Sequence, residues 1–340
     1  MQKINTTNKK PLSDFCSFLL SNGFEFQQEI SLNKFSYFRT GGVVSCLIFP
    51  HNYQQLIEVI NTLNLFNLEF KVVGATSNIL FLDNMNQEVM VSVKKITNFT
   101  FNNEKSLAIV GAGMMIPSLV KKVNDNGAFG FSGLNGIPAQ VGGAIFMNAG
   151  AYGDCISDYL YRVDVINLNG ELCSYSKEEL DFSFRKSRFK NEQLGVIVQA
   201  YFKIKTGDTN EARLALKAYK KDRLTFQEKN LPNLGSAFAT YDIYTDLAKN
   251  NSSYRLIYLA FKVFYKIHIP NNNIFLNYVT AKYFGWKFDK KPYSDKTLNC
   301  LVNRGIHTNN YLEYISILKK LTNDSVKLEN EIFPNPLKMK

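Results

Sequence analysis

The sequence predicts an α+β protein with more than one domain, and three observations support this. Residues 45–93 alternate strand-like and helix-like segments, which is typical of a βαβ unit. Residues 161–175 form two strand-like runs about Asn169-Gly170, a dipeptide typical of hairpins. A charged helical pattern begins at Thr209, and we place a domain boundary near Gly207. A chain of 340 residues is long enough for two or three domains.

The individual elements follow from apolar periodicity and from glycine and proline stops. Helices are predicted at residues 14–23, 51–63, 116–126, 209–223 and around 312–321. Strands are predicted at 45–49, 69–73, 79–82, 89–93, 107–110, 161–167, 172–175 and 195–205, with extended chain at 36–39. The aromatic, basic and apolar stretch 252–269 is predicted to be a buried helix or a strand pair. A lid over a ligand and an oligomer contact are the alternatives for it.

Charge and cysteine usage narrow the class of protein. The net charge is +11, but basic residues are scattered and no arginine-rich arm is present, so an anionic small molecule is favoured over nucleic acid. Five widely spaced cysteines without a CxxC pair argue against a zinc site or a disulfide framework and favour a reducing, cytoplasmic setting. The three histidines are isolated, so no metal is predicted. The N-terminus lacks a signal-peptide core and no apolar run reaches roughly 18 residues, so no membrane insertion is expected.

The most unusual stretch is FGFSGLNGIPAQVGGAIFMNAGAYG at residues 129–153. Seven of the chain's 20 glycines lie between Gly130 and Gly153, and no charged residue occurs from Asn126 to Gly153. Glycine at this density indicates tight turns or backbone lying against a ligand, and uncovered amides near a helix start bind phosphate. A ligand cradle is favoured over a buried packing loop. A second candidate phosphate site is the turn GATSN after the strand at 69–73, although the Rossmann GxGxxG pattern is absent.

Several blocks, in this order, resemble one family, UDP-N-acetylenolpyruvoylglucosamine reductase (UDP-N-acetylmuramate dehydrogenase). FRTGG (38–42), VVGATSN (72–78) and GLNGIPAQVGGAIFMNAGAYG (133–153) are similar to its T-x-GG, LGGGSN and G-IPG-VGGA-xxNxGAYG elements. FRKSRFK (184–190), GSAF (235–238) and LENEI (328–332) are similar to its YRxSxFK, GSxFKNP and LEPEV elements. The third of these blocks is the most specific, and together they span nearly the whole chain.

The resemblance implies a two-lobed FAD-binding fold of the vanillyl-alcohol-oxidase (PCMH) type, followed by an α+β substrate-binding domain. It implies FAD-binding subdomains at 1–98 and 99–207 and a substrate domain at 208–340 with an extra segment near 241–277. It further implies that NADPH reduces FAD, and that hydride then passes to C3 of an enolpyruvyl group while a proton goes to C2. The expected product is UDP-N-acetylmuramate, a peptidoglycan precursor, and the protein is expected to be a monomer or weak oligomer.

The resemblance also assigns site residues. Arg185 matches the arginine that polarises the substrate carboxylate, Ser236 the serine that protonates C2, and Glu331 the late glutamate that supports the enolate. A guanidinium suits a carboxylate because it donates two parallel hydrogen bonds. The residues implied for FAD are Arg39, Thr40, Gly74, Ala75, Thr76, Ser77, Asn78, Gly136, Ile137, Pro138, Gly142, Gly143, Asn148, Gly150, Ala151 and Tyr152. Of these, 74–78 and Gly142-Gly143 are expected at the pyrophosphate and 148–152 nearer the ring and ribose.

The chain departs from the family pattern mainly where the substrate nucleotide is expected. After GSAF the family has a basic residue and Asn-Pro, and this chain has Ala239, Thr240 and Tyr241. Each lost charge-assisted contact is worth about 1.5–3 kcal/mol. Further departures are Phe184 for tyrosine, Thr76 for the third glycine of GGGSN, and Thr297 for the histidine of SxKHA. These departures leave three hypotheses open: the peptidoglycan enzyme, a flavin reductase paralogue acting on another nucleotide-sugar or enolpyruvyl substrate in capsule or O-antigen synthesis, and a flavin-binding subunit without catalysis. The survival of Arg185, Ser236 and Glu331 argues against the third.

Overall fold

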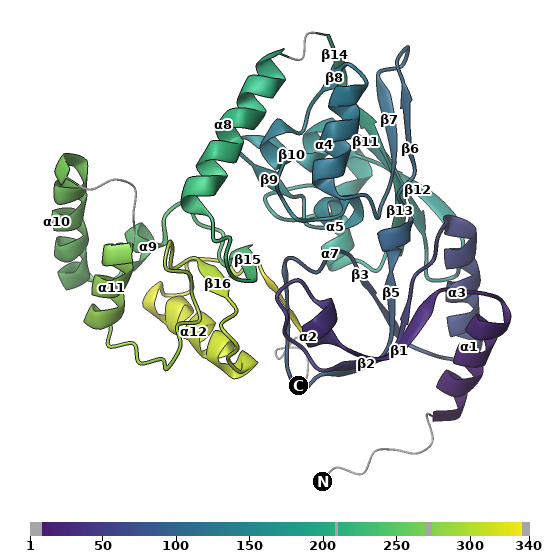
Figure 1. Ribbon diagram of the computed structural model, residues 1–340, viewed down its shortest axis with the longest axis horizontal. Helices are drawn as coiled ribbons and strands as arrows, with labels where there is room; N and C mark the ends of the chain where they lie inside the picture. The colour runs from purple at the N-terminus through teal and green to yellow at the C-terminus, as the bar shows by residue number, and fades with distance from the viewer. Residues whose placement is uncertain (1–8, 208–209, 269–273, 335–340) are drawn as a thin grey trace. The chain divides into compact units, whose positions relative to one another are not determined.

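The structure is a computed structural model that describes residues 9–207, 210–268 and 274–334 (Figure 1). It divides into two compact units. Unit 1 contains residues 1–30, 43–75 and 86–220, and unit 2 contains residues 31–42, 76–85 and 221–340. The chain therefore enters unit 2 twice before its C-terminal third. The three contiguous domains expected from the sequence stay a prediction.

Unit 1 holds two large sheets and two small two-stranded ones, β10-β9 and β14-β8, among the residues that the structure describes. The first has the strand order β1-β2-β5-β3, in which β2 and β3 both pair in parallel with β5, as the predicted βαβ unit requires. The second is antiparallel, in the order β12-β11-β13-β7-β6. The strand bounds are β1 Phe26–Ser31, β2 Val43–Ile48, β3 Phe70–Val73, β5 Asn86–Ser92, β6 Phe99–Asn102, β7 Leu107–Gly111, β11 Leu160–Ile166, β12 Leu172–Ser176 and β13 Val196–Lys203.

Local chemistry explains where several of these elements start and stop. Helix α3 (Tyr53–Leu65) begins where the side chain of Asn52 accepts a hydrogen bond from Gln55 N at 2.9 Å, which is a regular N-cap. The β11–β12 hairpin turns at Gly170, whose φ of +79° is favourable for glycine, and this confirms the predicted hairpin. Helices α1 (Lys9–Ser21) and α4 (Ile116–Asp125) pack their apolar sides into the core of unit 1.

The remaining elements of unit 1 are short or lie at its border. They are β8 Ala128–Phe129, α5 Val141–Phe146, β9 Gly150–Ala151, β10 Asp154–Cys155, α6 Ile156–Tyr159, α7 Arg188–Asn191, β14 Lys205–Thr206 and α8 Asn210–Phe226, whose last turns belong to unit 2. Most of them lie in or near the glycine-rich stretch. They give that stretch a fixed path instead of leaving it as an irregular loop.

Unit 2 is built from two small sheets and a set of helices around an aromatic core. Strand β17 pairs in parallel with β4, and β15 pairs antiparallel with β16. Tyr254, Tyr311 and Tyr314 are fully buried in this core. The bounds are α2 Leu32–Phe35, β4 Ile79–Phe81, β15 Asn233–Ser236, α9 Ile243–Lys249, α10 Ser252–His268, α11 Ile274–Tyr283, β16 Cys300–Val302, α12 Thr308–Leu321 and β17 Glu331–Phe333.

One expectation about local structure is wrong, and a second is right only in part. Residues 36–39 are not extended but form a turn after α2. The stretch 252–269, where the structure describes it, is a single helix, α10, which confirms the helix alternative, but the helix is buried on one side only.

Candidate functional site

The glycine-rich stretch is fixed in unit 1 by backbone hydrogen bonds from the first two residues of α5. Val141 N donates to Met114 O and Gly142 N donates to Ala112 O, both at 2.9 Å. A Cβ on Gly142 would lie 3.1 Å from the Cβ of Ala112, so this glycine permits close packing. Its amide already has an acceptor. Gly143 is exposed, with no atom within 4 Å of the place where its Cβ would stand, and is therefore the better placed of the two for an anionic ligand.

Gln140 joins the two predicted phosphate sites within unit 1. A Cβ on Gly74 would lie 3.3 Å from Gln140 Oε1, so the end of β3 and the start of α5 are neighbours. Gln140 is 6% exposed, and its Oε1 is buried without a hydrogen-bond partner among the described residues. A buried amide oxygen without a partner needs an explanation, and a ligand donor supplies one. The sequence signal was available, because Gln140 is the only polar side chain between Gly136 and Met147.

Arg185 lies at the tip of a tight turn that is fastened to the end of α5. Ser183 and Lys186 pair across the turn through two backbone hydrogen bonds of 3.1 Å, and Arg185 has a φ of +56°. Asn148 Nδ2 donates to Ser183 O at 2.9 Å, and Ser187 Oγ donates to Phe146 O at 2.7 Å. The FRKSRFK block is thus held by the glycine-rich block, which connects two of the sequence blocks in space.

The charge of Arg185 acts on Cys155 in the β9–β10 hairpin, which begins at the end of the glycine-rich stretch. Burial raises the pKa of the Cys155 thiol, Asp158 raises it further, and Arg185 opposes the shift. The neighbouring Tyr152 has a φ of +53° and stacks on Tyr219 of α8, with ring centroids 4.4 Å apart. The arginine, the hairpin and Asn148 therefore form one cluster in unit 1.

Backbone strain is concentrated at the predicted site residues. Among the described residues, twelve non-glycine residues have positive φ, and five of them are residues that the sequence assigns to the site. Such conformations cost of order 1–3 kcal/mol each and cluster where function requires a fixed geometry. The five are Arg39, Thr76, Asn148, Tyr152 and Arg185. Thr76 stands at a glycine of the family pattern, and its Oγ1 accepts a hydrogen bond from Tyr37 N at 2.8 Å.

In unit 2, Ser236 and Glu331 lie on neighbouring segments that a buried asparagine ties together. Ser236 ends β15 and Glu331 begins β17. Between them, the side chain of Asn330 donates to Asn78 Oδ1 at 2.8 Å, to Leu234 O at 3.1 Å and to Ser236 O at 3.3 Å. Sequence reasoning weighed only the glutamates of LENEI and missed Asn330, which is 4% exposed.

Asn78 fixes the other end of this arrangement. Its Nδ2 donates to Glu329 O at 3.0 Å, and its backbone O accepts from Glu331 N at 2.9 Å. In the described structure the side chain of this predicted cofactor residue therefore holds the LENEI segment. Ser77 is half-buried in the same turn.

We expect Asn330→Ala to lower the free energy of unfolding by about 1–3 kcal/mol, because buried acceptors lose their donor. Asn330→Asp is expected to cost more, since its carboxylate would face the oxygens of Asn78, Leu234 and Ser236. Thermal melting followed by circular dichroism measures both. The same changes at Asn103, an exposed turn residue, are the control and should leave the melting midpoint nearly unchanged. Equal midpoints for the Asn330 and Asn103 variants would contradict this role.

The FRTGG block is held within unit 2 from both sides. Ser36 Oγ donates to Thr40 O at 2.8 Å, and Asn303 Nδ2 donates to Phe38 O at 2.7 Å and to Arg39 O at 3.0 Å. Thr40 is 3% exposed, and its Oγ1 is buried without a partner among the described residues. Like Gln140, Thr40 therefore has a polar atom left for a ligand.

Thr240, which stands where the family pattern implies a phosphate contact, instead forms a hydrogen bond within the protein. Thr240 Oγ1 donates to the carboxylate of Asp246, and Tyr258 OH of α10 donates to Asp242. Tyr241 is fully exposed. The position after GSAF is therefore bordered by two carboxylates, which would repel an anionic diphosphate.

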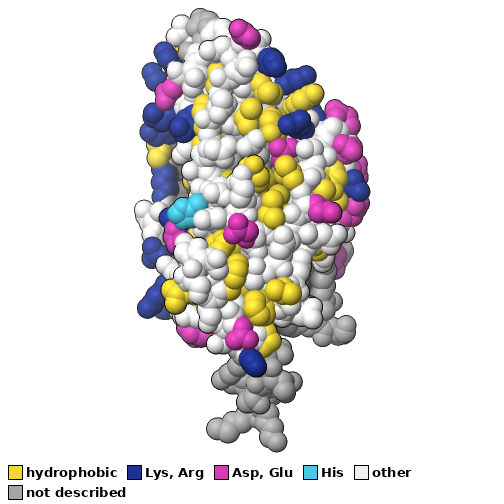
Figure 2. Space-filling model, turned by 90° about the vertical axis from the view of Figure 1, so that its right-hand side faces the viewer, with side chains coloured by type: hydrophobic (Ala, Val, Ile, Leu, Met, Phe, Trp, Pro, Cys, Tyr) yellow, Lys and Arg dark blue, Asp and Glu magenta, His cyan; other side chains and the backbone are white. Residues whose placement is uncertain are grey.

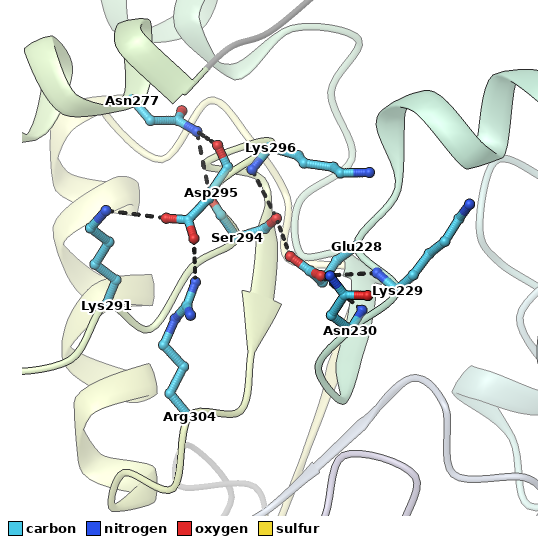
Figure 3. Close-up of polar contacts among 9 residues, drawn as sticks. All are labelled: Glu228, Lys229, Asn230, Asn277, Lys291, Ser294, Asp295, Lys296 and Arg304. Carbon is cyan, nitrogen blue, oxygen red and sulfur yellow. Dashed lines mark hydrogen bonds and ion pairs between the residues drawn. The ribbon is translucent and has the colours of Figure 1, made fainter.

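The SDKTLN segment has a supporting role in unit 2 (Figure 3). Ser294 Oγ donates to Glu228 at 3.1 Å, and Lys296 Nζ donates to the Gln227 carbonyl at 2.8 Å, which holds the loop before β15. Asp295 accepts from Lys291 and Arg304. These contacts stabilise the approach to Ser236, and Thr297 Oγ1 accepts from Asn299 N at 3.1 Å.

Surface charge, the described helices and the arrangement of possible metal ligands add three facts. The face drawn in Figure 2 carries basic side chains mostly along its left edge and acidic ones mostly along its right edge, so this face is not the uniformly basic surface typical of nucleic-acid binders. No helix in the described ranges has the length and apolar character to cross a bilayer. Within the same ranges, no group of three or more His, Cys, Asp or Glu side chains is placed to hold a metal ion.

The residues of unit 1 fit a bound dinucleotide. Gly143 is exposed on a short helix, Gly74 lies beside Gln140, and the buried oxygens of Gln140 and Asn148 have no partner among the described residues. The glycines allow a ligand to approach the backbone closely, which suits the phosphates of a cofactor. The two buried oxygens are acceptors without a partner, which suits the N–H groups of its rings. Gly136, Ile137 and Pro138 lead into this region, and Gly150 and Ala151 form β9 beyond it. The individual contacts stay predictions.

Comparisons with known proteins agree with this geometry. A family model described as "FAD binding domain" matches residues 44–176. A UDP-N-acetylenolpyruvoylglucosamine reductase of Prochlorococcus marinus is 31% identical over 217 residues, which are 64% of this chain and 74% of that protein. The enzyme of the same name from Carboxydothermus hydrogenoformans is 37% identical over 200 residues, 59% of this chain and 66% of that protein.

A solved structure extends the likeness to the fold of nearly the whole chain. The crystal structure of UDP-N-acetylenolpyruvylglucosamine reductase from Thermus caldophilus has a TM-score of 0.65, with 24% sequence identity. The match covers 92% of this chain and 99% of that chain. At this identity the likeness establishes the fold. The predicted class, a two-lobed FAD-binding fold of the PCMH type followed by an α+β domain, is confirmed.

Proposed function

Because the chain belongs to the UDP-N-acetylenolpyruvoylglucosamine reductase family, we propose that it reduces UDP-N-acetylglucosamine enolpyruvate to UDP-N-acetylmuramate in the cytoplasm, with NADPH as the electron donor. The chain is an FAD-dependent oxidoreductase of peptidoglycan synthesis. The observation that most supports the proposal is that Asn330, the residue before Glu331, donates a hydrogen bond to the backbone carbonyl of Ser236, so these two segments of unit 2 are neighbours. Survival of this arrangement would be unexpected in a flavoprotein that had lost its chemistry.

FAD, when bound, supplies the hydride that is added to C3 of the enolpyruvyl group. That addition builds negative charge next to the substrate carboxylate, and the protein must stabilise this charge and then protonate C2. Arg185 serves the first need, because a guanidinium on a fixed turn requires no reorganisation during the reaction. Ser236 donates the proton to C2. A hydroxyl is a weak acid, so Glu331 supports the enolate and the proton transfer.

A second candidate substrate is favoured by one observation in unit 2. At the position where the family binds nucleotide phosphates, the Thr240 hydroxyl donates a hydrogen bond to the carboxylate of Asp246 and accepts one from the backbone N–H of Asp242. Carboxylates at this position disfavour a diphosphate. The alternative that we retain is a flavin reductase paralogue that acts on a different nucleotide-sugar or enolpyruvyl substrate in capsule or O-antigen synthesis. Of these, the observation favours a substrate that places no diphosphate at this position.

The experiment starts with the colour of the purified protein. A yellow protein whose flavin is released by denaturation supports the cofactor assignment, and a colourless protein that takes up no added FAD would contradict it. NADPH is then expected to bleach the flavin, and UDP-N-acetylglucosamine enolpyruvate is expected to restore its colour. If NADPH bleaches the flavin but this substrate leaves it bleached, the alternative substrate is favoured. NADH in a parallel sample measures donor preference.

A further inference from the structure

Helix α10 is apolar on two opposite sides, and only one of them is covered. On the inner side Tyr254 is fully buried and its OH contacts Thr280 Oγ1 at 2.7 Å, while Tyr258 is 5% exposed. On the outer side four large apolar side chains are exposed, each by 47–70% of its surface. They are Leu256, Leu259, Val263 and Phe264, and we call them the outer face.

The outer face follows helical spacing, so it is one continuous strip. Leu256, Leu259 and Val263 are three and four residues apart, which places them on one side of the helix. A helix at the surface of a soluble domain normally presents polar residues there. Exposed Phe275 of α11 lies close to this region, because its ring stacks on that of Phe261 at 6.4 Å. A contiguous apolar patch of this kind marks an interaction surface.

The charged residues around the outer face indicate the kind of partner that it fits. Arg255 and Lys262 are exposed beside the outer face, and Lys262 Nζ lies 4.7 Å from the ring of Tyr258. No Asp or Glu occurs anywhere from residue 247 to residue 288. Over the same residues the chain has six cations: Lys249, Arg255, Lys262, Lys266, Lys282 and Lys287. Helix α10 therefore combines exposed apolar side chains with positive charge and carries no acidic residue of its own. Nearby carboxylates are already engaged, since Asp242 accepts from Tyr258 on the inner side and Asp246 pairs with Lys249.

We propose that α10 docks the protein on an anionic lipid surface. The outer face would enter the boundary between headgroups and acyl chains, and Arg255 and Lys262 would lie at the lipid phosphates. This is contact with one leaflet, because no described helix is suited to span a bilayer. A second copy of the chain fits less well, since a symmetric contact through α10 would bring the same cations together.

The test uses the full, flavin-loaded chain and co-sedimentation with vesicles. Vesicles with equal parts of phosphatidylglycerol and phosphatidylcholine are expected to pellet the protein, and phosphatidylcholine alone is not. The variant L256Q/V263Q is expected to weaken binding by about tenfold or more, because apolar burial is lost. The variant R255Q/K262Q is expected to weaken it by about 25-fold, at roughly fivefold per cation, and added salt should also weaken it.

The matched control is L20Q/L65Q, which changes two exposed leucines of unit 1 that are 74% and 80% exposed. It should bind as the unchanged protein does, and circular dichroism and flavin content show that every variant is folded. Failure of the unchanged protein to bind the anionic vesicles would overturn the proposal. So would equal binding by L256Q/V263Q, or light scattering that shows self-association abolished by that variant, since the outer face would then be a subunit contact.

Discussion

In a Ser236→Ala variant, recovery of the flavin colour on addition of UDP-N-acetylglucosamine enolpyruvate is expected to slow by about 10²- to 10⁴-fold, the range for loss of a positioned acid. Bleaching of the flavin by NADPH is expected to be unchanged, because that half-reaction needs no proton at C2. Rapid-mixing measurements of the two half-reactions separate these effects.

The control for Ser236 is a hydroxyl in unit 2 that supports the fold without a proposed role in the chemistry. Ser294 donates to Glu228, so Ser294→Ala removes a hydroxyl contact of the loop before β15. It should slow the second half-reaction far less than Ser236→Ala does. Equal slowing of both half-reactions in Ser236→Ala would show that the assigned role of this serine is wrong.

Arg185→Ala is the second variant with a large expected effect. Loss of a fixed donor to developing charge costs about 10²- to 10³-fold in the substrate half-reaction. Arg185→Lys is expected to recover only part of this, because an ammonium keeps the charge but cannot make two parallel hydrogen bonds. Measurement of both half-reactions in the two variants checks this, and full activity of the lysine variant would contradict the proposed carboxylate contact.

A chemical measurement checks the position of Arg185 independently of activity. Since the arginine lowers the pKa of Cys155 against burial and Asp158, its removal should raise that pKa and leave less thiolate. Alkylation of Cys155, followed by mass spectrometry of its peptide, is therefore expected to be slower in Arg185→Ala than in the unchanged protein. Lys186→Ala removes the neighbouring exposed charge and is the matched control.

Much of the fold follows from local chemistry that the sequence displays. The Asn169-Gly170 turn, the helix stop at Gly127 and the alternation between residues 45 and 93 all predict elements that the structure contains. The glycine-rich stretch is also recognisable, because its lack of charge and its seven glycines are local properties. Such features depend on a few neighbouring residues and can therefore be predicted from their sequence.

The parts that were missed depend on contacts between distant residues. Arg39 takes its left-handed conformation in a turn held by Asn303, which lies 264 positions away. Asn330 matters through three acceptors, none of which is close to it in sequence. From the sequence, Thr76 is only a departure from the glycine of the family pattern. In the structure its hydroxyl oxygen accepts a hydrogen bond from Tyr37 N. No local pattern indicates these partners, although the residue types themselves were visible.

The most direct test of the proposed reaction is the fate of protons at C2 and C3 of the product. In D₂O with unlabelled NADPH, the account predicts UDP-N-acetylmuramate that carries one deuterium at C2, delivered from solvent, and deuterium at C3 as well, because a hydrogen held on a flavin nitrogen exchanges with solvent. Mass spectrometry and NMR read both positions. Unlabelled hydrogen at C2, or formation of no product from UDP-N-acetylglucosamine enolpyruvate by a flavin-loaded protein that NADPH bleaches, would contradict it.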